Sequence, residues 1–598
     1  MKSNKLLWLF ALMLSFVLVL AACASDDDVD PEGGDDDGED TTETDTDSDT
    51  DDEEGTEEDD AEGEAEGDAD FDTEGNHLVI AVPSDVVSLD PHGSNDVPSS
   101  NARSNIYDTL VGQNEDLEIV EGLATDWEEV DETTWSFTLR EGVTFHDGSE
   151  FTAEVAKANL DRILDPVVAS ERAFLYEMIT DVEVVGDYEL HITTEYPFAP
   201  LLSHLAHDAG GMMSMDVIEE DYAQAYEESG YTEEEVQELA DAAEGAEEES
   251  AEAEEFNEAV GAVGEYIGQY VAQNAAGTGY FEVDERISGE RLTLSRYDDY
   301  WGEAAAADAI SFKVVPETSA RIAELETGNS HIIQDVGPDN VDRVDGTDGV
   351  SVNMQDSVSL NYVGFNVQSE PFDDERVRQA VNLLINQEEI IDGIYDGNGI
   401  PAIGPLAPDV FGYDENVDGL GHDPERAQEL LEEAGYADGF ETTIWTNDNE
   451  RRVDTALYVQ SILGEYNIDV EVEELEWGAY LDRTANGEHD MFILGWSTVT
   501  ADADYGLYAL FHSSAVGSTG DRSFLENDEL DELLDAGRRE ADPEARQEIY
   551  SEAQELLTEL APMAYLNHQT YLTGVSDEVS GFSVDPLGIF QLHEATIE

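Results

Sequence analysis

Residues 422–496 read HDPERAQELLEEAGYADGFETTIWTNDNERRVDTALYVQSILGEYNIDVEVEELEWGAYLDRTANGEHDMFILGW, and their pattern decides the fold class. The segment opens with a helix signature in which Asp423 is the N-cap, Pro424 the first helical residue and Gly435 the stop. Strand-like runs at 440–446, 468–477 and 490–496 then alternate with helix-like runs at 450–467 and 478–488. This alternation is typical of βαβ units, so the sequence predicts an α/β fold with a parallel sheet.

The loop after this segment, in FILGWSTVTADADYGLYALFHSS (492–514), is the first candidate for a binding site. Ligands of open α/β sheets bind just beyond the carboxyl ends of the strands, and residues 497–504 follow such an end. The same residues also fit a capped surface turn in which Asp502 and Asp504 are solvated acids. Position favours a pocket, and the turn stays open as the alternative.

The charge balance limits the partners of this chain. Its 598 residues include 23 lysines and arginines against 145 aspartates and glutamates, a formal net charge of −122. Such a surface repels nucleic acid and anionic lipid headgroups, so no nucleic-acid partner is expected. Acid spread along the whole chain is typical of a halophilic acidic proteome, in which external salt screens the repulsion. The length predicts two or more globular units.

The N-terminus indicates export. Lys2 and Lys5 precede the apolar run LLWLFALMLSFVLVL, and LAAC follows at residues 20–23, so residues 1–23 are predicted to be a signal peptide. The only cysteine of the chain, Cys23, ends this run, and LAAC resembles a bacterial lipobox. The resemblance implies that Cys23 is lipidated and becomes the mature N-terminus. Residues 24–75 are almost entirely acidic or small, and we expect them to form a disordered acidic tether at the extracellular face of the membrane.

Three further segments show patterns of their own. Residues 133–149 and 182–198 alternate apolar and polar side chains as half-buried strands do. Residues 217–275 are rich in alanine and glutamate, and we expect an insertion of one or two acidic surface helices there.

The chain carries no motif of an enzyme. It lacks a phosphate-binding glycine loop with its lysine, a G-x-S-x-G elbow and an H-E-x-x-H motif, so no catalytic residue and no cofactor are assigned. His204 and His207 with the methionines nearby are the best metal candidates, but no third ligand is fixed near them. Packing is the better interpretation of this cluster, and we predict no metal site and no enzymatic activity.

An ordered set of stretches across residues 76–598 resembles one family, the extracytoplasmic solute-binding proteins of bacterial ABC importers, family 5. The stretches are SLDPHG (88–93), NIYDTLVG (105–112), residues 122–166, GTGYF (277–281), RYDDYWG (296–302), residues 371–391 and DPERAQELLEEAGY (423–436). Residues 439–449 and 495–511 look most like the glutathione- and dipeptide-binding members. The resemblance implies a two-lobed periplasmic-binding-protein-like α/β fold with an extra β-containing subdomain. Lobe I would comprise residues 76–315, including the insertion, and lobe II residues 316–555, with residues 556–598 returning to lobe I.

The resemblance also implies a set of ligand-binding residues. In the loop after Trp496, we expect Ser497 and Thr498 to meet peptide amides, and Asp502 or Asp504 to pair with a ligand ammonium. Trp496 itself fits either stacking on ligand or closing the core. The remaining candidates are Arg103 for a ligand carboxylate, and Asn361, Tyr362 and Asn366 on a strand that begins the ligand face of lobe II.

The predicted function is therefore a lipid-anchored receptor that captures peptide, glutathione included, and delivers it to an ABC permease and ATPase complex. The receptor is expected to be a monomer, and the closed, loaded form is the one that a permease recognises. Binding of a nickel chelate or an oligosaccharide is the alternative within this class. A surface sensor or adhesin without a transport role is the alternative from another class.

Overall fold

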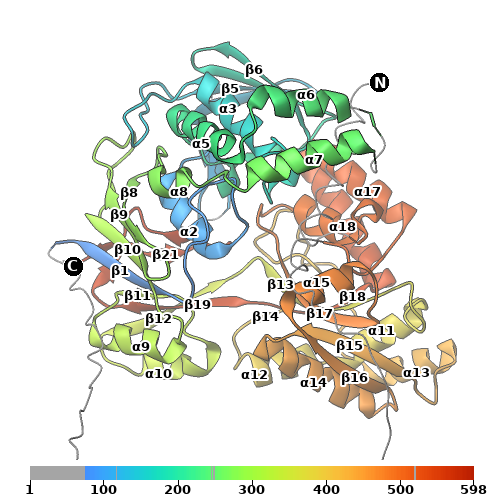
Figure 1. Cartoon of the computed structure of the whole chain (residues 1–598). Coiled ribbons are helices and arrows are strands. Elements are labelled where there is room, and N and C mark those ends of the chain that lie inside the picture. Colours follow the sequence, from blue (N-terminus) through green and yellow to red (C-terminus); the bar gives the residue numbers. More distant parts are fainter. Residues whose placement is uncertain (1–74, 116, 244, 247–249, 518–519) are drawn as a thin grey trace, which may run out of the picture. The chain divides into compact units, whose positions relative to one another are not determined.

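A computed structural model describes residues 75–598 except 116, 244, 247–249 and 518–519 (Figure 1). The predicted signal peptide, the lipidation site Cys23 and the tether up to residue 74 lie outside the described residues. Within the described part, no helix is both long and apolar enough to cross a membrane.

The segment that decides the fold class forms one half of a six-stranded sheet. Strands β15 (Glu441–Asn447), β16 (Asp469–Leu475) and β17 (Met491–Ser497) are parallel neighbours, joined by α14 (Glu450–Gly464) and α15 (Trp477–Ala485). The predicted βαβ units are confirmed, and so is the helix before them. Asp423 caps α13 (Pro424–Ala434) by accepting from the Arg426 amide, and Gly435 ends it with a φ of +96°.

Antiparallel strands complete this sheet in the order β14-β18-β13-β17-β15-β16. The strands added are β13 (Ser359–Phe365), β14 (Ile400–Pro401) and β18 (Met563–His568). Around the sheet lie α11 (Glu375–Leu384), α12 (Gln387–Ile394), α16 (Ala509–Phe511), α17 (Asp528–Arg539) and α18 (Pro543–Leu560) (Figure 1). Two apolar cores flank the sheet, one centred on Val363, Leu384 and Val459 and the other on Leu360, Leu507 and Tyr550. We call residues 357–568 lobe II.

A second, mixed sheet of seven strands contains both the start and the end of the globular chain. Its order is β12-β19-β11-β1-β10-β9-β8, in which β1 is parallel to β10 and β11. The strands are β1 (His77–Val82), β8 (Phe281–Ile287), β9 (Arg291–Arg296), β10 (Ala309–Val314), β11 (Ile332–Ile333), β12 (Val350–Asp356) and β19 (Thr570–Ser576). The helices of this part are α2 (Val97–Ile106), α9 (Thr318–Thr327) and α10 (Val341–Asp345). Short pairings β20 (Val579–Ser580) with β23 (Thr596–Ile597) and β21 (Ser583–Val584) with β22 (Phe590–Gln591) follow β19.

The predicted extra β-containing subdomain is a four-stranded antiparallel sheet in the order β4-β5-β7-β6. It comprises β4 (Ala124–Asp131), β5 (Thr134–Leu139), β6 (Ile179–Gly186) and β7 (Glu189–Thr194), with α3 (Ala153–Ile163) and the hairpin β2 (Val111–Gln113) and β3 (Ile119–Glu121). We group it with the seven-stranded sheet as lobe I. These sheets confirm the predicted α/β fold with an additional β subdomain.

The chain passes between the two larger sheets at residues 357–358 and again at 569. Ser357 donates its amide to the Gln569 carbonyl at 2.9 Å, so the two passages are neighbours. The boundaries expected from sequence lay at 315/316 and 555/556, earlier than both passages. The difference arises because β11, β12 and β18 are each placed by long-range pairing, which local pattern does not reveal. That these two lobes close around a ligand stays a prediction.

The described residues of the acidic insertion form four helices rather than one or two, and Gly230 ends the first of them in a left-handed conformation, with a φ of +78°. They are α5 (Met215–Ser229), α6 (Glu233–Ala243), α7 (Ala251–Gly264) and α8 (Val271–Asn274), and α4 (Leu201–Leu205) precedes them. The insertion is tied to lobe I by a buried cation. Arg162 lies 2.6 Å from Asp90 and 2.8 Å from Asp221 of α5. All three side chains are buried, so α5 is part of the packed structure.

Candidate functional site

A cavity of about 420 Å³ lies at the carboxyl edge of the parallel strands of lobe II. Lobe II contributes Asn361, Tyr395 and the start of α14, and lobe I contributes residues such as Gln334 and Tyr571. Both lobes therefore line it, at the edge of the sheet where a ligand site is expected. We call it the arginine cavity, after Arg451 and Arg452.

Arg451 and Arg452 are the notable groups of this cavity. Arg451 donates to the Ile394 carbonyl at 2.8 Å, and Arg452 donates to Oδ1 of Asn447 at 3.0 Å. Neither is part of an ion pair with any described carboxylate, although the chain has about six acids for each basic residue. Two half-buried cations thus face a shared space without an ion-pair partner among the described residues, since Asp335 of lobe I, an acid that also lines this space, pairs with neither of them.

The backbone around these arginines also suits an anion. Both residues lie in the first turn of α14, where the helix dipole and the unpaired amides favour negative charge. Gly495 of β17 leaves the space beside Arg452 open, because a Cβ there would lie 3.5 Å from its Nη2. The same Cβ would lie 3.4 Å from Oδ1 of Asn361, so Gly495, Asn361 and Arg452 surround the same small space. An arginine fork, an amide and a helix start can together hold a carboxylate.

A second cavity of about 440 Å³ adjoins the first, because Val97 and Phe590 line both. Five aromatic side chains line it, namely Tyr107, Tyr280, Tyr300, Trp301 and Phe590. Ser497, the last residue of β17, and Val499, from the loop after it, line it from lobe II. We call it the aromatic cavity.

Asp108 is an acid of the aromatic cavity that forms no ion pair with a cation of the described chain. Its Oδ2 accepts from Trp301 Nε1 at 2.8 Å and from the Thr278 hydroxyl at 2.9 Å, and its Oδ1 accepts from the Tyr300 hydroxyl at 3.4 Å. Burial raises the pKa of Asp108 to about 6. The three hydrogen bonds and the more distant positive charge of Arg140 lower this pKa, but they offset the effect of burial only in part. A ligand ammonium beside Asp108 would supply the missing positive charge.

The raised pKa predicts how stability depends on pH. An unfolded aspartate titrates near 3.9, so the stabilising contribution of Asp108 is fully present below about pH 4 and is lost as pH rises through about 6. Relative to Asp108→Asn, the ligand-free protein should therefore lose about 1–3 kcal/mol between pH 4 and pH 7. Urea denaturation midpoints of both proteins across this range measure the difference. Parallel pH profiles would contradict the prediction.

The residues predicted in the loop after β17 divide between cavity and core. Ser497 lines the aromatic cavity, as expected of a ligand contact. Thr498 is 1% exposed, and its amide faces the Val358 carbonyl at 3.4 Å. Trp496 stacks on Tyr505 with ring centroids 5.1 Å apart and packs against cores of both lobes. The core-closing alternative for Trp496 is thus the one that these contacts favour.

The two acids of the loop already have partners inside the protein. Arg546 contacts Asp502 through two bonds of 2.6 and 2.7 Å, and Arg538 contacts Asp504 through two of 2.9 Å. Burial alone raises the pKa of Asp504, but the Arg538 guanidinium outweighs it and holds that pKa below its ordinary value. Neither acid is among the residues that line the aromatic cavity. These contacts disfavour the expected role of Asp502 or Asp504 as partner of a ligand ammonium.

The other predicted residues separate in the same way. Asn361 lines the arginine cavity, but Tyr362 is fully buried against Phe492. Asn366 donates to the Gly487 and His489 carbonyls, at the far end of β13, because β13 runs antiparallel to β17. Arg103 borders the aromatic cavity, but it is 2% exposed and lies 2.7 Å from Asp208.

Sequence reasoning missed Arg451, Arg452 and Asp108. A signal for the arginines does exist, since two adjacent cations follow directly on a predicted strand end in a chain with very few cations. For Asp108 we find no such signal, because one acid among 145 cannot be singled out before its surroundings are known.

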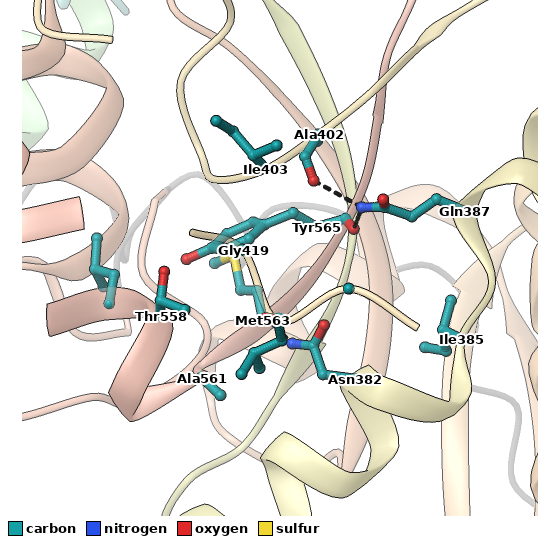
Figure 2. A pocket seen from close by; sticks show the side chains of 13 residues that line it. Asn382, Ile385, Gln387, Ala402, Ile403, Gly419, Thr558, Ala561, Met563 and Tyr565 are labelled. Carbon is teal, nitrogen blue, oxygen red and sulfur yellow. Dashed lines mark hydrogen bonds between the residues drawn. The ribbon is translucent and has the colours of Figure 1, made fainter. Parts of the chain in front are cut away.

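A third, smaller cavity of about 130 Å³ lies within lobe II, and Figure 2 shows its lining. The Gln387 amide donates there to the carbonyls of Ala402 and Tyr565. The volume is below the several hundred cubic ångströms of usual ligand pockets. The two cavities that both lobes line are therefore the better candidates for the main site.

Comparisons with known proteins agree with the fold described above. Residues 118–518 match the family described as bacterial extracellular solute-binding proteins, family 5 middle. The dipeptide-binding protein of Escherichia coli is 27% identical over 506 residues, which cover 80% of this chain and 86% of that protein. The glutathione-binding protein GsiB of Salmonella typhi is 27% identical over 530 residues, or 87% of this chain and 94% of that protein.

A similar solved structure is the periplasmic binding protein DppA of Helicobacter pylori in complex with the peptide STSA. It is 29% identical, with a TM-score of 0.68, and the match covers 87% of this chain and 98% of that one. The fold and the sequence thus point to the same group of proteins.

Proposed function

Because the chain belongs to family 5 of the bacterial extracellular solute-binding proteins, we propose that it captures peptide outside the cell and delivers it to the permease of an ABC importer. The relatives named above bind dipeptides, glutathione or a tetrapeptide. Peptides with a free C-terminus, glutathione among them, are therefore the proposed ligands. The protein acts by binding and release rather than by catalysis.

The observation that carries this proposal is the pair Arg451 and Arg452. In a chain of net charge −122, two cations without an ion pair border a cavity between the lobes. The missing counter-ion is supplied by a carboxylate of the ligand, which two arginines and a helix start hold well.

The rest of the peptide extends from there into the aromatic cavity. Its ammonium pairs with Asp108, and its amides meet Ser497 at the end of β17. Because a bound ammonium favours the ionised carboxylate, binding below about pH 6 releases a proton from Asp108. Affinity for peptides with a free amine should accordingly rise between pH 5 and pH 7.

Calorimetry with the full globular chain tests the function. Glutathione and a set of free dipeptides and tripeptides are titrated at pH 7, each beside its C-terminally amidated form. We expect binding heat for members of the free set and affinities about tenfold or more weaker for the amides, the loss of a charge-assisted bond. No heat and no thermal shift with any peptide would refute the peptide proposal.

Oligosaccharide binding is the second candidate, and the five aromatic side chains of the aromatic cavity favour it, since sugar rings stack on such surfaces. Neutral oligosaccharides belong in the same titration set. Heat from sugars alone would make this the function.

The lipid anchor is a separate part of the proposal and rests on LAAC and Cys23. The mature protein is held at the outer face of the membrane through a diacylated Cys23. Mass spectrometry of the N-terminal peptide tests this, and a Cys23→Ala variant should be released into the medium. An unmodified cysteine would contradict the anchor.

A further inference from the structure

Arg172 is a buried cation of the aromatic cavity whose hydrogen-bonding capacity is largely unused. The side chain belongs to a residue that is 7% exposed and lines the cavity. Its Nη1 approaches the Tyr505 hydroxyl at 3.5 Å, the limit of a hydrogen bond. Its Nε has no hydrogen-bond partner among the described residues, and no described carboxylate forms an ion pair with it.

Most other buried arginines of the described chain have an acid or several acceptors, although the Nε of Arg162 also lacks a hydrogen-bond partner. Arg103, Arg162, Arg538 and Arg546 each pair with an aspartate. Arg321 lacks an acid, but it donates to four carbonyl groups and a hydroxyl. Leaving a buried charge without compensation is costly, so Arg172 is the exception that a bound group would explain.

The neighbours of Arg172 in the cavity do not supply this group. Asp208 lines the same cavity, but Arg103 and the Ser100 hydroxyl already occupy its Oδ2. Burial lowers the pKa of His207 to about 3, so its imidazole is neutral and does not neutralise an incoming anion. Ser497 and Val499 bring the backbone of lobe II to the cavity wall. The vicinity of Arg172 thus combines a fixed positive charge with one nearby carboxylate, Asp208, whose hydrogen bonds already go to Arg103 and Ser100.

We propose that Arg172 receives a second acidic group of the ligand, so that the preferred substrates are peptides with two carboxylates. This inference rests on the proposed function, in which Arg451 and Arg452 hold the first carboxylate. The two cavities adjoin, so one extended ligand reaches both. A glutamyl side chain, or a γ-linked glutamate with its free α-carboxylate, carries the required group.

Matched peptides test the inference with the wild-type globular chain. Tripeptides of alanine carry glutamate at the first, second or third position, and each is compared with its glutamine isostere by calorimetry. We expect at least one glutamate peptide to bind about tenfold or more tightly than its glutamine form. A ratio near one at all three positions overturns the inference while peptide binding, and so the proposed function, stands.

Variants then assign the effect to Arg172. In Arg172→Met the glutamate preference should disappear while affinity for the glutamine peptides stays unchanged. Arg426→Met removes the same charge from the exposed face of α13 and should keep the preference. Arg172→Lys keeps the positive charge and serves as the second variant if Arg172→Met fails to fold. It should retain only part of the glutamate preference. An undiminished preference in the folded Arg172 variants refutes the assignment, and absence of all peptide binding in the wild type refutes the proposed function itself.

Discussion

Replacing Arg451 and Arg452 together with methionine is expected to weaken the binding of free peptides about 100-fold or more, since each charge-assisted bond contributes roughly 1.5–3 kcal/mol. Methionine keeps an unbranched stem of similar length, so packing beside Tyr395 and Trp477 is largely preserved. Calorimetry with the tightest peptide of the wild-type set measures the change. The loss should come from the ligand carboxylate alone.

Amidated peptides give the internal control for this prediction. They lack the carboxylate, so wild type and double variant should bind them equally weakly. Arg483→Met is the matched control variant, because Arg483 lies on α15 of the same lobe, pairs with Glu488 and lies over the Trp445 ring. It should leave peptide affinity within about twofold. Equal binding of free peptides by wild type and double variant would place the carboxylate elsewhere.

Local pattern was sufficient for the parallel strands of lobe II and the helices that join them. The predicted strand 440–446 is observed as Glu441–Asn447, and the helix 450–467 as Glu450–Gly464. Such segments are set by capping and periodicity within a dozen residues, which a single sequence displays directly. The position of the site at the carboxyl edge followed from the same pattern, because it depends on strand direction alone.

The roles of individual charges could not be predicted in this way. Asp502 meets an arginine 44 positions later and Asp504 one 34 positions later, and no local signal announces either pair. In a chain with 145 acids, a loop acid near a pocket is a weak candidate until the cations are placed. The few basic residues are the better guide to a site in this chain, since an arginine without an acidic partner is rarer than an acid without a basic partner.

The ion pairs of the loop nevertheless connect the candidate site with the contact between the lobes. Arg538, which holds Asp504, also donates to the Tyr196 hydroxyl at 3.1 Å, and its carbonyl accepts from the Ala199 amide at 2.9 Å. Tyr196 and Ala199 follow β7 of the extra subdomain. The loop that brings Ser497 to the aromatic cavity is thus fixed by both lobes.

Breaking the buried pair of Asp502 and Arg546 is expected to destabilise the protein by about 3–5 kcal/mol, because an uncompensated charge stays behind. Both residues are 6% exposed, and Arg546 also donates to the Gly537 carbonyl at 2.8 Å. Arg546→Met leaves the Asp502 carboxylate without its ion-pair partner, and Asp502→Asn leaves the Arg546 guanidinium without its own. The double variant Asp502→Leu/Arg546→Met removes both charges and should recover much of the loss. Denaturant midpoints of the four proteins complete the double-mutant cycle.

The same variants decide between the two roles of Asp502. If its main partner is Arg546, Asp502→Asn lowers stability, and the affinity for free peptides at 15 °C, where the variant is still folded, changes less than about threefold. If Asp502 instead holds the ligand ammonium, Asp502→Asn leaves stability nearly unchanged and lowers the affinity for free peptides about tenfold or more. The affinity for N-acetylated peptides, which lack the ammonium, then stays the same. The bidentate geometry at 2.6 and 2.7 Å favours the first outcome. An acid with both oxygens engaged by one guanidinium would have to lose a buried ion pair before it could serve a ligand, and that cost exceeds the gain from one new contact.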